Sequence, residues 1–121
     1  MAIRSLYCLA LEPNGWGLST RKMVLEQANH NVFKTVNGEE TVRIVSMFPF
    51  DALLMDTHCD DMDPLEIVKS VRSVAPKVRI IVISKDGVCP PELREAVDLY
   101  LPDWEPATAV RAIEVFLQVA S

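Results

Sequence analysis

The chain has 121 residues, half of which are hydrophobic, and a formal net charge of −5. We expect a single domain over residues 1–121, because this apolar content is enough to bury a core without disulfide bonds. The negative charge argues against nucleic acids and anionic membrane surfaces as direct partners, since both repel an acidic domain.

The cysteines also bear on where the protein is found. Cys8, Cys59 and Cys89 are an odd number of thiols and form no Cys-x-x-Cys spacing. This pattern favours the reducing cytoplasm over a secreted, disulfide-linked protein. The apolar run before Glu12 is too short to span a membrane. We therefore expect a cytoplasmic domain, either standalone or cut from a longer protein.

Five short apolar runs alternate along the chain with five segments of helical character. Apolar runs bounded by turn residues predict strands that are covered on both faces. The expected strands, in chain order, are 6–11, 32–36, 50–55, 80–83 and 99–101.

The intervening segments place apolar residues three or four positions apart, which predicts amphipathic helices. In the first helix, Ser19 is expected at the N-cap, and the buried stripe is expected to hold Met23, Val24, Gln27 and Ala28. The expected helices, in chain order, are 19–30, 39–47, 64–74, a short one within 89–97, and 106–119.

A strand followed by a helix, repeated five times, predicts a parallel sheet joined by right-handed crossovers. The expected fold is α/β and doubly wound, a flavodoxin-like five-stranded sheet of order 2-1-3-4-5 with helices on both faces. Sites in such sheets form beyond the carboxyl ends of the strands. Asp56 stands at that end of the third strand and Ser84 at that end of the fourth.

Several strings in this order resemble the receiver domain of two-component response regulators, over essentially the whole chain. In "FDALLMDTHCDDMDPLEIVKSVR" an oily strand ends in Asp56, and a Met-Asp pair precedes the next helix. "VNGEETV" is similar to the family's turn into the second helix, "RIIVIS" ends in Ser84, and "DLYL" contains Tyr100. The resemblance implies a phosphoacceptor role for Asp56, a phosphoryl-binding hydroxyl at Ser84 and a switch aromatic at Tyr100.

Two departures from the family pattern concern the chemistry of the site. Receivers place an acidic pair after the first strand to hold Mg²⁺, but "CLALEP" puts Ala10 and Leu11 at those positions and Glu12 one place later. A shift of one residue would bring Glu12 to the metal. Receivers also place a lysine after the fifth strand, where "YLPDWEP" offers Asp103. Charge neutralisation supplies most of the catalysis in phosphoryl transfer, so both departures weaken it.

Two functional alternatives follow from the resemblance. In the first, the chain is a pseudo-receiver and not an enzyme, and it signals through protein contacts with weak or no Mg²⁺-dependent phosphorylation. In the second, Asp56 is a true phosphoacceptor and Glu12 helps to bind Mg²⁺. The implied partners are a histidine kinase or an output domain, with a homodimer through the fourth helix, fifth strand and fifth helix as one possibility. A flavodoxin-like ligand-binding role lacks a phosphate loop in this sequence.

Other clusters of polar residues have simpler interpretations. Asp60, Asp61 and Asp63 lack the spacing of a calcium loop and are expected to favour the N-terminus of the helix at 64–74. His58 with Cys59 and Cys89 lacks a fourth ligand for zinc. Two tryptophans are expected in loops on the site face, at positions Trp16 and Trp104.

Overall fold

The computed structural model of the chain describes residues 4–12, 18–84, 87–102 and 105–120. Within these ranges five parallel strands form one sheet of order β2-β1-β3-β4-β5, which confirms the expected topology. The strands are β1 (Tyr7–Leu11), β2 (Asn31–Thr35), β3 (Ala52–Met55), β4 (Arg79–Ile83) and β5 (Leu99–Leu101). The helices are α1 (Leu18–Gln27), α2 (Gly38–Met47), α3 (Pro64–Val74), α4 (Pro91–Ala96) and α5 (Pro106–Ala120).

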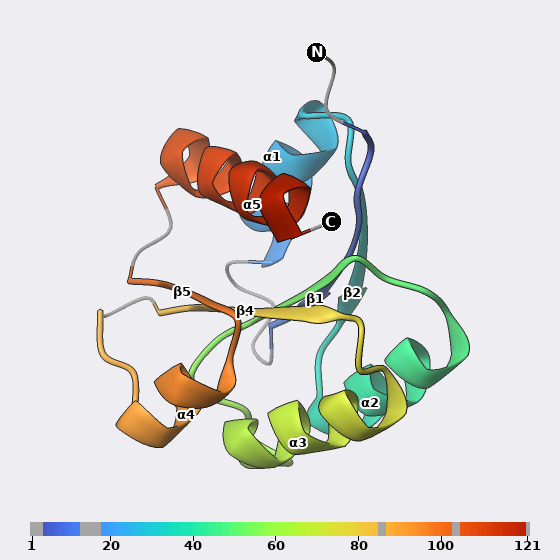
Figure 1. Ribbon diagram of the computed structural model, residues 1–121, viewed down its shortest axis with the longest axis vertical. Coiled ribbons are helices and arrows are strands. Elements are labelled where there is room, and N and C mark those ends of the chain that lie inside the picture. The colour runs from blue at the N-terminus through green and yellow to red at the C-terminus, as the bar shows by residue number, and fades with distance from the viewer. Residues whose placement is uncertain (1–3, 13–17, 85–86, 103–104, 121) are drawn as a thin grey trace.

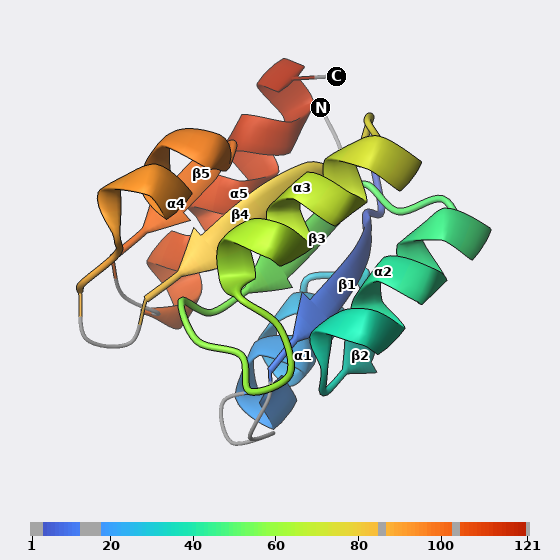
Figure 2. The same cartoon turned by 90° about the horizontal axis from the view of Figure 1, so that it is seen from below.

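The helices form one layer on each face of the sheet. Figure 1 shows α1 and α5 on one side and α2, α3 and α4 on the other, and Figure 2 shows the second layer in front of the strands. Alternate residues of the central strands enter two separate cores. Cys8, Ala10 and Leu54 pack toward α1 and α5, whereas Leu53 and Met55 pack toward the other layer. The unbroken apolar character of these strands follows from this burial on both faces.

The first helix departs from the sequence-based expectation. It begins at Leu18, so Ser19 lies inside its first turn and is not the residue before it. Leu25 is fully buried, while Met23 is 53% exposed. Few of its residues are strongly apolar, and the sequence therefore gave little contrast between its faces. The helix ends early because Asn29 adopts a left-handed conformation with φ of 68°.

The other helices bury largely the faces that their periodicity predicts. Val45 of α2 and Val68 and Val71 of α3 are buried, as are three residues of α5: Val110, Ile113 and Leu117. Val74, the last residue of α3, is 45% exposed. Among the residues that the structure describes, none of the helices is long and apolar enough to cross a membrane.

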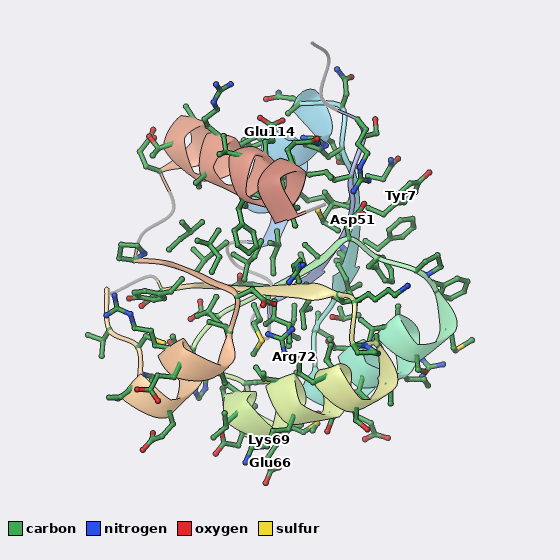
Figure 3. All side chains as sticks on the ribbon, viewed as in Figure 1. Tyr7, Asp51, Glu66, Lys69, Arg72 and Glu114 are labelled. Carbon is green, nitrogen blue, oxygen red and sulfur yellow. The ribbon has the colours of Figure 1, made fainter. Side chains whose placement is uncertain are left out.

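A buried histidine connects α5 to the start of the sheet. His30 Nδ1 accepts a hydrogen bond from the backbone N–H of Leu6 at 3.1 Å, and Nε2 lies 2.6 Å from Glu114 Oε2. Because Nδ1 is an acceptor, the ring proton is on Nε2, which donates to the carboxylate of Glu114. Figure 3 shows Glu114 projecting from α5 beside α1. The pair therefore fixes α5 against the turn that follows α1.

A second set of polar contacts, made by Arg72, joins α3 to the residues that precede β4 and β5. Arg72 donates to the carbonyl oxygens of Val78 and Ala96 and lies 2.8 Å from Asp98. Asp98 also accepts from the backbone N–H of Ile80 at 2.7 Å. Figure 3 shows Arg72 projecting from α3 toward the sheet. One side chain thus holds together the starts of β4 and β5 and the end of α4.

We expect Glu114→Ala to lower the free energy of unfolding by about 1–3 kcal/mol, because it leaves the buried Nε2–H of His30 without an acceptor. Glu114→Gln keeps a carbonyl oxygen that can accept this bond and should lose less. Urea denaturation of the two variants and the wild-type chain measures both effects. Equal losses for alanine and glutamine would show that the hydrogen bond does not stabilise the fold.

Candidate functional site

Three sequence-predicted residues meet at the carboxyl edge of the sheet. Glu12, Asp56 and Ser84 are the residues that directly follow β1, β3 and β4. Leu11 pairs with Met55 in the register of β1 and β3, so Glu12 and Asp56 are the next residues along two adjacent strands. The register therefore sets these two carboxylate residues side by side at the end of the buried sheet.

Glu12 and Asp56 differ in their surroundings. Glu12 is 1% exposed, and its backbone N–H donates to the carbonyl oxygen of Thr35 at 3.1 Å. Asp56 is half-buried, and its Oδ1 accepts from the backbone N–H of Thr57 at 2.6 Å and from the Thr57 hydroxyl at 3.2 Å. Ala10 and Leu11, at the positions of the family's acidic pair, are core residues on opposite faces of the sheet. Glu12 is therefore the carboxylate residue that follows β1 at the carboxyl end of the sheet.

The hydroxyl of Ser84 contributes to the loop after β4. Ser84 is fully buried, and its backbone N–H donates to the carbonyl oxygen of Leu101 at 2.9 Å. Its Oγ donates to the carbonyl oxygen of Val88 at 2.9 Å. This contact closes the turn toward α4, as expected of a serine at a strand end.

Tyr100 lies in β5 at the edge of the α2–α4 core. Its ring is half-buried, and the guanidinium carbon of Arg94 is 5.2 Å from the ring centroid. The Tyr100 hydroxyl is buried and makes no hydrogen bond in the part of the chain that the structure describes. The sequence indicated the aromatic residue but not its cationic partner, which comes from α4.

The loop from Asp56 to Asp63 is tied to the start of α2. Asp61 accepts from the backbone N–H groups of Gly38 at 2.8 Å and Glu39 at 3.0 Å. Asp61 thus caps α2 and not the helix that it precedes, whereas Asp63 caps α3 by accepting from Leu65 at 2.9 Å. Local sequence carries no signal for the first contact, because Asp61 and Gly38 are 23 residues apart.

Close packing accompanies this cap. A Cβ atom added to Gly38 would lie 2.8 Å from the Cδ1 of Ile67 and 3.0 Å from the sulfur of Met62. The family-like Asn-Gly turn therefore has a packing reason in this chain, because any larger residue would require the side chains of Ile67 and Met62 to shift. Asn37 completes the turn by accepting from the backbone N–H of Glu40 at 2.7 Å.

The thiol of Cys59 contacts the same carboxylate, that of Asp61. The Cys59 thiol donates to Asp61 at 3.1 Å, and burial together with the neighbouring carboxylate raises the pKa of Cys59. The hydrogen bonds from Gly38, Cys59 and Glu39 lower the pKa of Asp61. The cluster therefore holds a protonated thiol against an ionised carboxylate at neutral pH.

The site offers a limited set of metal ligands. Mg²⁺ prefers oxygen ligands, and Glu12 and Asp56 supply two carboxylates in adjacent register. Within the described ranges, no group of three or more histidine, cysteine, aspartate or glutamate residues is arranged to hold a metal. Cys59 and Cys89 are both free thiols. Asp103, Trp16 and Trp104 lie outside the described residues.

Comparison with known proteins identifies the relatives of this chain. The family model described as the response regulator receiver domain matches residues 18–103. A solved CheY-like receiver domain protein from Methanospirillum hungatei superposes with a TM-score of 0.86 at 18% identity, covering 96% of each chain. The receiver domain of a sensor histidine kinase from Pseudomonas aeruginosa, solved with a magnesium ion in its active-site cleft, gives a TM-score of 0.84 at 18% identity and covers 95% of this chain and 99% of that one.

Curated relatives are much longer than the aligned segments. A probable histidine kinase 1 from Oryza sativa is 35% identical over 65 residues, which are 54% of this chain and 7% of the kinase. The cell cycle transcriptional regulator CtrA from Caulobacter vibrioides is 25% identical over 76 residues, which are 63% of this chain and 33% of the regulator. The similarity therefore concerns one domain of each relative.

We expect Asp61→Asn to destabilise the chain at neutral pH, because asparagine has one acceptor oxygen in place of two and no negative charge at the helix N-terminus. The pKa of Asp61 is lowered in the folded state, so its stabilisation is fully present above the unfolded pKa of about 4 and is lost as the pH falls through the folded value. Urea midpoints of both proteins from pH 7 to pH 2.5 test this. A difference between them that stayed constant down to pH 2.5 would contradict it.

Proposed function

The chain belongs to the response regulator receiver domain family, and we propose that it is a pseudo-receiver that signals through protein contacts, with weak or no Mg²⁺-dependent phosphorylation. It acts as a signalling module and not as an enzyme with a turned-over substrate. The proposal rests on charged residues that this sequence lacks. Ala10 and Leu11 stand where receivers have an acidic pair, and Asp103 stands where they have a lysine.

The charge balance opposes phosphoryl transfer to Asp56. The incoming group is anionic, and its transfer is driven by cations that neutralise the charge of the transition state. The sequence contains no lysine or arginine between Leu101 and Pro106, the segment that follows β5. Loss of one such electrostatic donor typically costs ~10²–10³ in rate, or about 3–4 kcal/mol. A carboxylate in its place adds repulsion to that loss.

The fold in turn supports a role in protein contacts. The α4, β5 and α5 elements that receivers use to bind partners are all formed here, and Tyr100 with Arg94 lies among them. We propose a histidine kinase or an output domain as the protein partner of this face, with a homodimer through the same face as an alternative use. The three free thiols support the proposed cytoplasmic location.

We expect no stable phosphoryl group on the chain after incubation with acetyl phosphate and Mg²⁺, because the cationic clamp is replaced by an acid. Intact mass spectrometry, together with a receiver of known activity treated in parallel, makes this measurement. A mass gain of one phosphoryl group that disappeared in Asp56→Asn would refute the proposal, whereas a gain retained in that variant would indicate modification elsewhere.

The register of β1 and β3 favours one alternative function, that of a true phosphoacceptor. Glu12 and Asp56 are adjacent, and Mg²⁺ sites that bind phosphates need only one or two carboxylates. When bound, the ion would supply positive charge between these oxygens. The sequence places one further cation, Lys85, directly after Ser84, at a position outside the described residues. In this alternative Glu12 and Asp56 hold the ion, and Asp56 receives the phosphoryl group.

Under this alternative, Mg²⁺ with beryllofluoride raises the melting temperature of the chain, and Glu12→Gln abolishes the rise, because one ligand of the ion has lost its charge. Asp60→Asn is the matched control, since Asp60 is exposed and contacts His58. A thermal-shift series over both variants makes the comparison. Our leading proposal predicts no shift for the wild-type chain, so the two functions give opposite results.

A further inference from the structure

The sheet has two free edges that differ in length and protection. β5 is three residues long, and Arg94 of α4 lies over its Tyr100 ring. β2 is five residues long and pairs with β1 on one side; in the described part of the chain nothing pairs with its other side. Short strands and charged side chains normally protect a sheet edge from pairing with another chain. On β2 the only charged residue is Lys34, and the strand contains no proline.

The hydrogen-bonding groups at this edge are set by the pairing of β1 and β2. The backbone N–H of Asn31 donates to Leu6, and the carbonyl oxygen of Thr35 accepts from Glu12. Backbone groups alternate in direction along a strand, so Asn31, Phe33 and Thr35 face β1. The N–H and C=O groups of Val32 and Lys34 therefore point away from β1. Lys34 is exposed, whereas Val32 as a whole residue is 6% exposed.

Exposed apolar side chains surround the same edge. Tyr7, Phe33 and Phe48 are 49%, 53% and 56% exposed, and the Phe33 ring meets the Phe50 ring edge-on with centroids 5.8 Å apart. A groove of about 790 Å³ opens between them. It is lined by apolar residues of β1, β2, α2 and the α2–β3 turn, together with Lys22 and Lys34. Figure 3 shows Tyr7 projecting outward beside β1 and β2.

We propose that this edge binds a second copy of the chain, with the two β2 strands antiparallel and Phe33 on the two-fold axis. In that register Val32 of each copy lies opposite Lys34 of the other, and these are the residues whose backbone groups point outward. Within each of the two Val32–Lys34 pairs, the two residues form two backbone hydrogen bonds with each other. The two Phe33 residues face each other between these pairs, as a non-hydrogen-bonded pair. Ten strands then form one continuous sheet.

Charge disfavours one of the other registers that the backbone allows. A pairing centred on Lys34 would place two ammonium groups directly opposite each other, which is destabilising. Centring on Phe33 places each lysine beside a valine, and its long side chain can extend past that valine into water. The second cation of the groove, Lys22, is already paired with Glu26 at 3.0 Å. No like charges of β2 are therefore brought together.

The available area also fits a self-complementary interface. A fully buried Phe or Tyr side chain removes about 150–250 Å² of surface from water. Tyr7, Phe33 and Phe48 are each about half exposed, so together they can bury about 300 Å² more per copy. Met23, Val36 and Met47, which are at least half exposed, lie on α1, after β2 and on α2, and both helices contact β2. Stable interfaces bury about 800 Å² per partner. The aromatic residues alone supply more than a third of this, before the strand backbone and the helices that flank it.

Sedimentation velocity over a range of concentrations tests the proposal, with the wild-type chain expected to form a dimer. Lys34→Pro removes the outward N–H but no bond to β1, and Phe33→Glu places two carboxylates together on the axis. Both are expected to sediment as monomers with unchanged circular dichroism. Val115→Glu, at an exposed position of α5, is the matched control and should remain dimeric.

A cysteine cross-link tests the register itself. Phe33→Cys should form an intermolecular disulfide under mild oxidation, because facing residues of a non-hydrogen-bonded pair have Cα atoms about 4.5 Å apart. Val115→Cys and the wild-type chain, with its own free thiols, measure the background. A wild-type chain that stays monomeric, a dimer that survives Lys34→Pro and Phe33→Glu, or a Phe33→Cys yield no higher than background would each overturn the proposal.

Discussion

Burial of β1, β3 and β4 on both faces is the constraint on which the rest of the molecule depends. Side chains that alternate between two apolar cores leave no face for water, so helices must cover the sheet on both sides. Each helix then returns the chain to the same end of the sheet, and all five strands run parallel. The carboxyl ends of the strands therefore lie together at one end of the sheet, where Glu12, Asp56 and Ser84 are the first polar side chains.

That edge is also where charge distinguishes this chain within its family. The scaffold has a half-buried aspartate after β3 and a serine after β4, but Ala10 and Leu11 stand at the positions of the family's acidic pair, and the sequence has Asp103 where receivers have a lysine. A fold of this kind survives such changes because Ala10 and Leu11 are apolar and pack within the two cores, so loss of the acidic pair leaves the burial of β1 intact. The capacity for phosphoryl chemistry and the stability of the sheet are thus carried by different residues, and one can be lost without the other.

Sequence periodicity was sufficient for the fold because the strands and the helices α2, α3 and α5 have strong apolar patterns. It failed at α1, where the buried face is decided by packing of Leu25 against the sheet and α5 and not by a contrast within the helix. It placed Asp56 and Ser84 at strand ends, where the structure also has them. It did not find the contacts of Asp61 with Gly38 or of Arg72 with Asp98, because these join residues that are distant in the chain. Such contacts depend on tertiary structure that no local pattern encodes.

The strand order has a consequence for how such a protein engages a larger assembly. β2 and β5 are at opposite edges of the sheet, so chains joined through β2 keep both of their α4–β5–α5 surfaces, one at each far end. A dimer of this kind is bivalent. Toward an oligomeric partner, the second contact forms at a high effective concentration once the first is made, so two weak contacts give a much longer-lived complex than either alone.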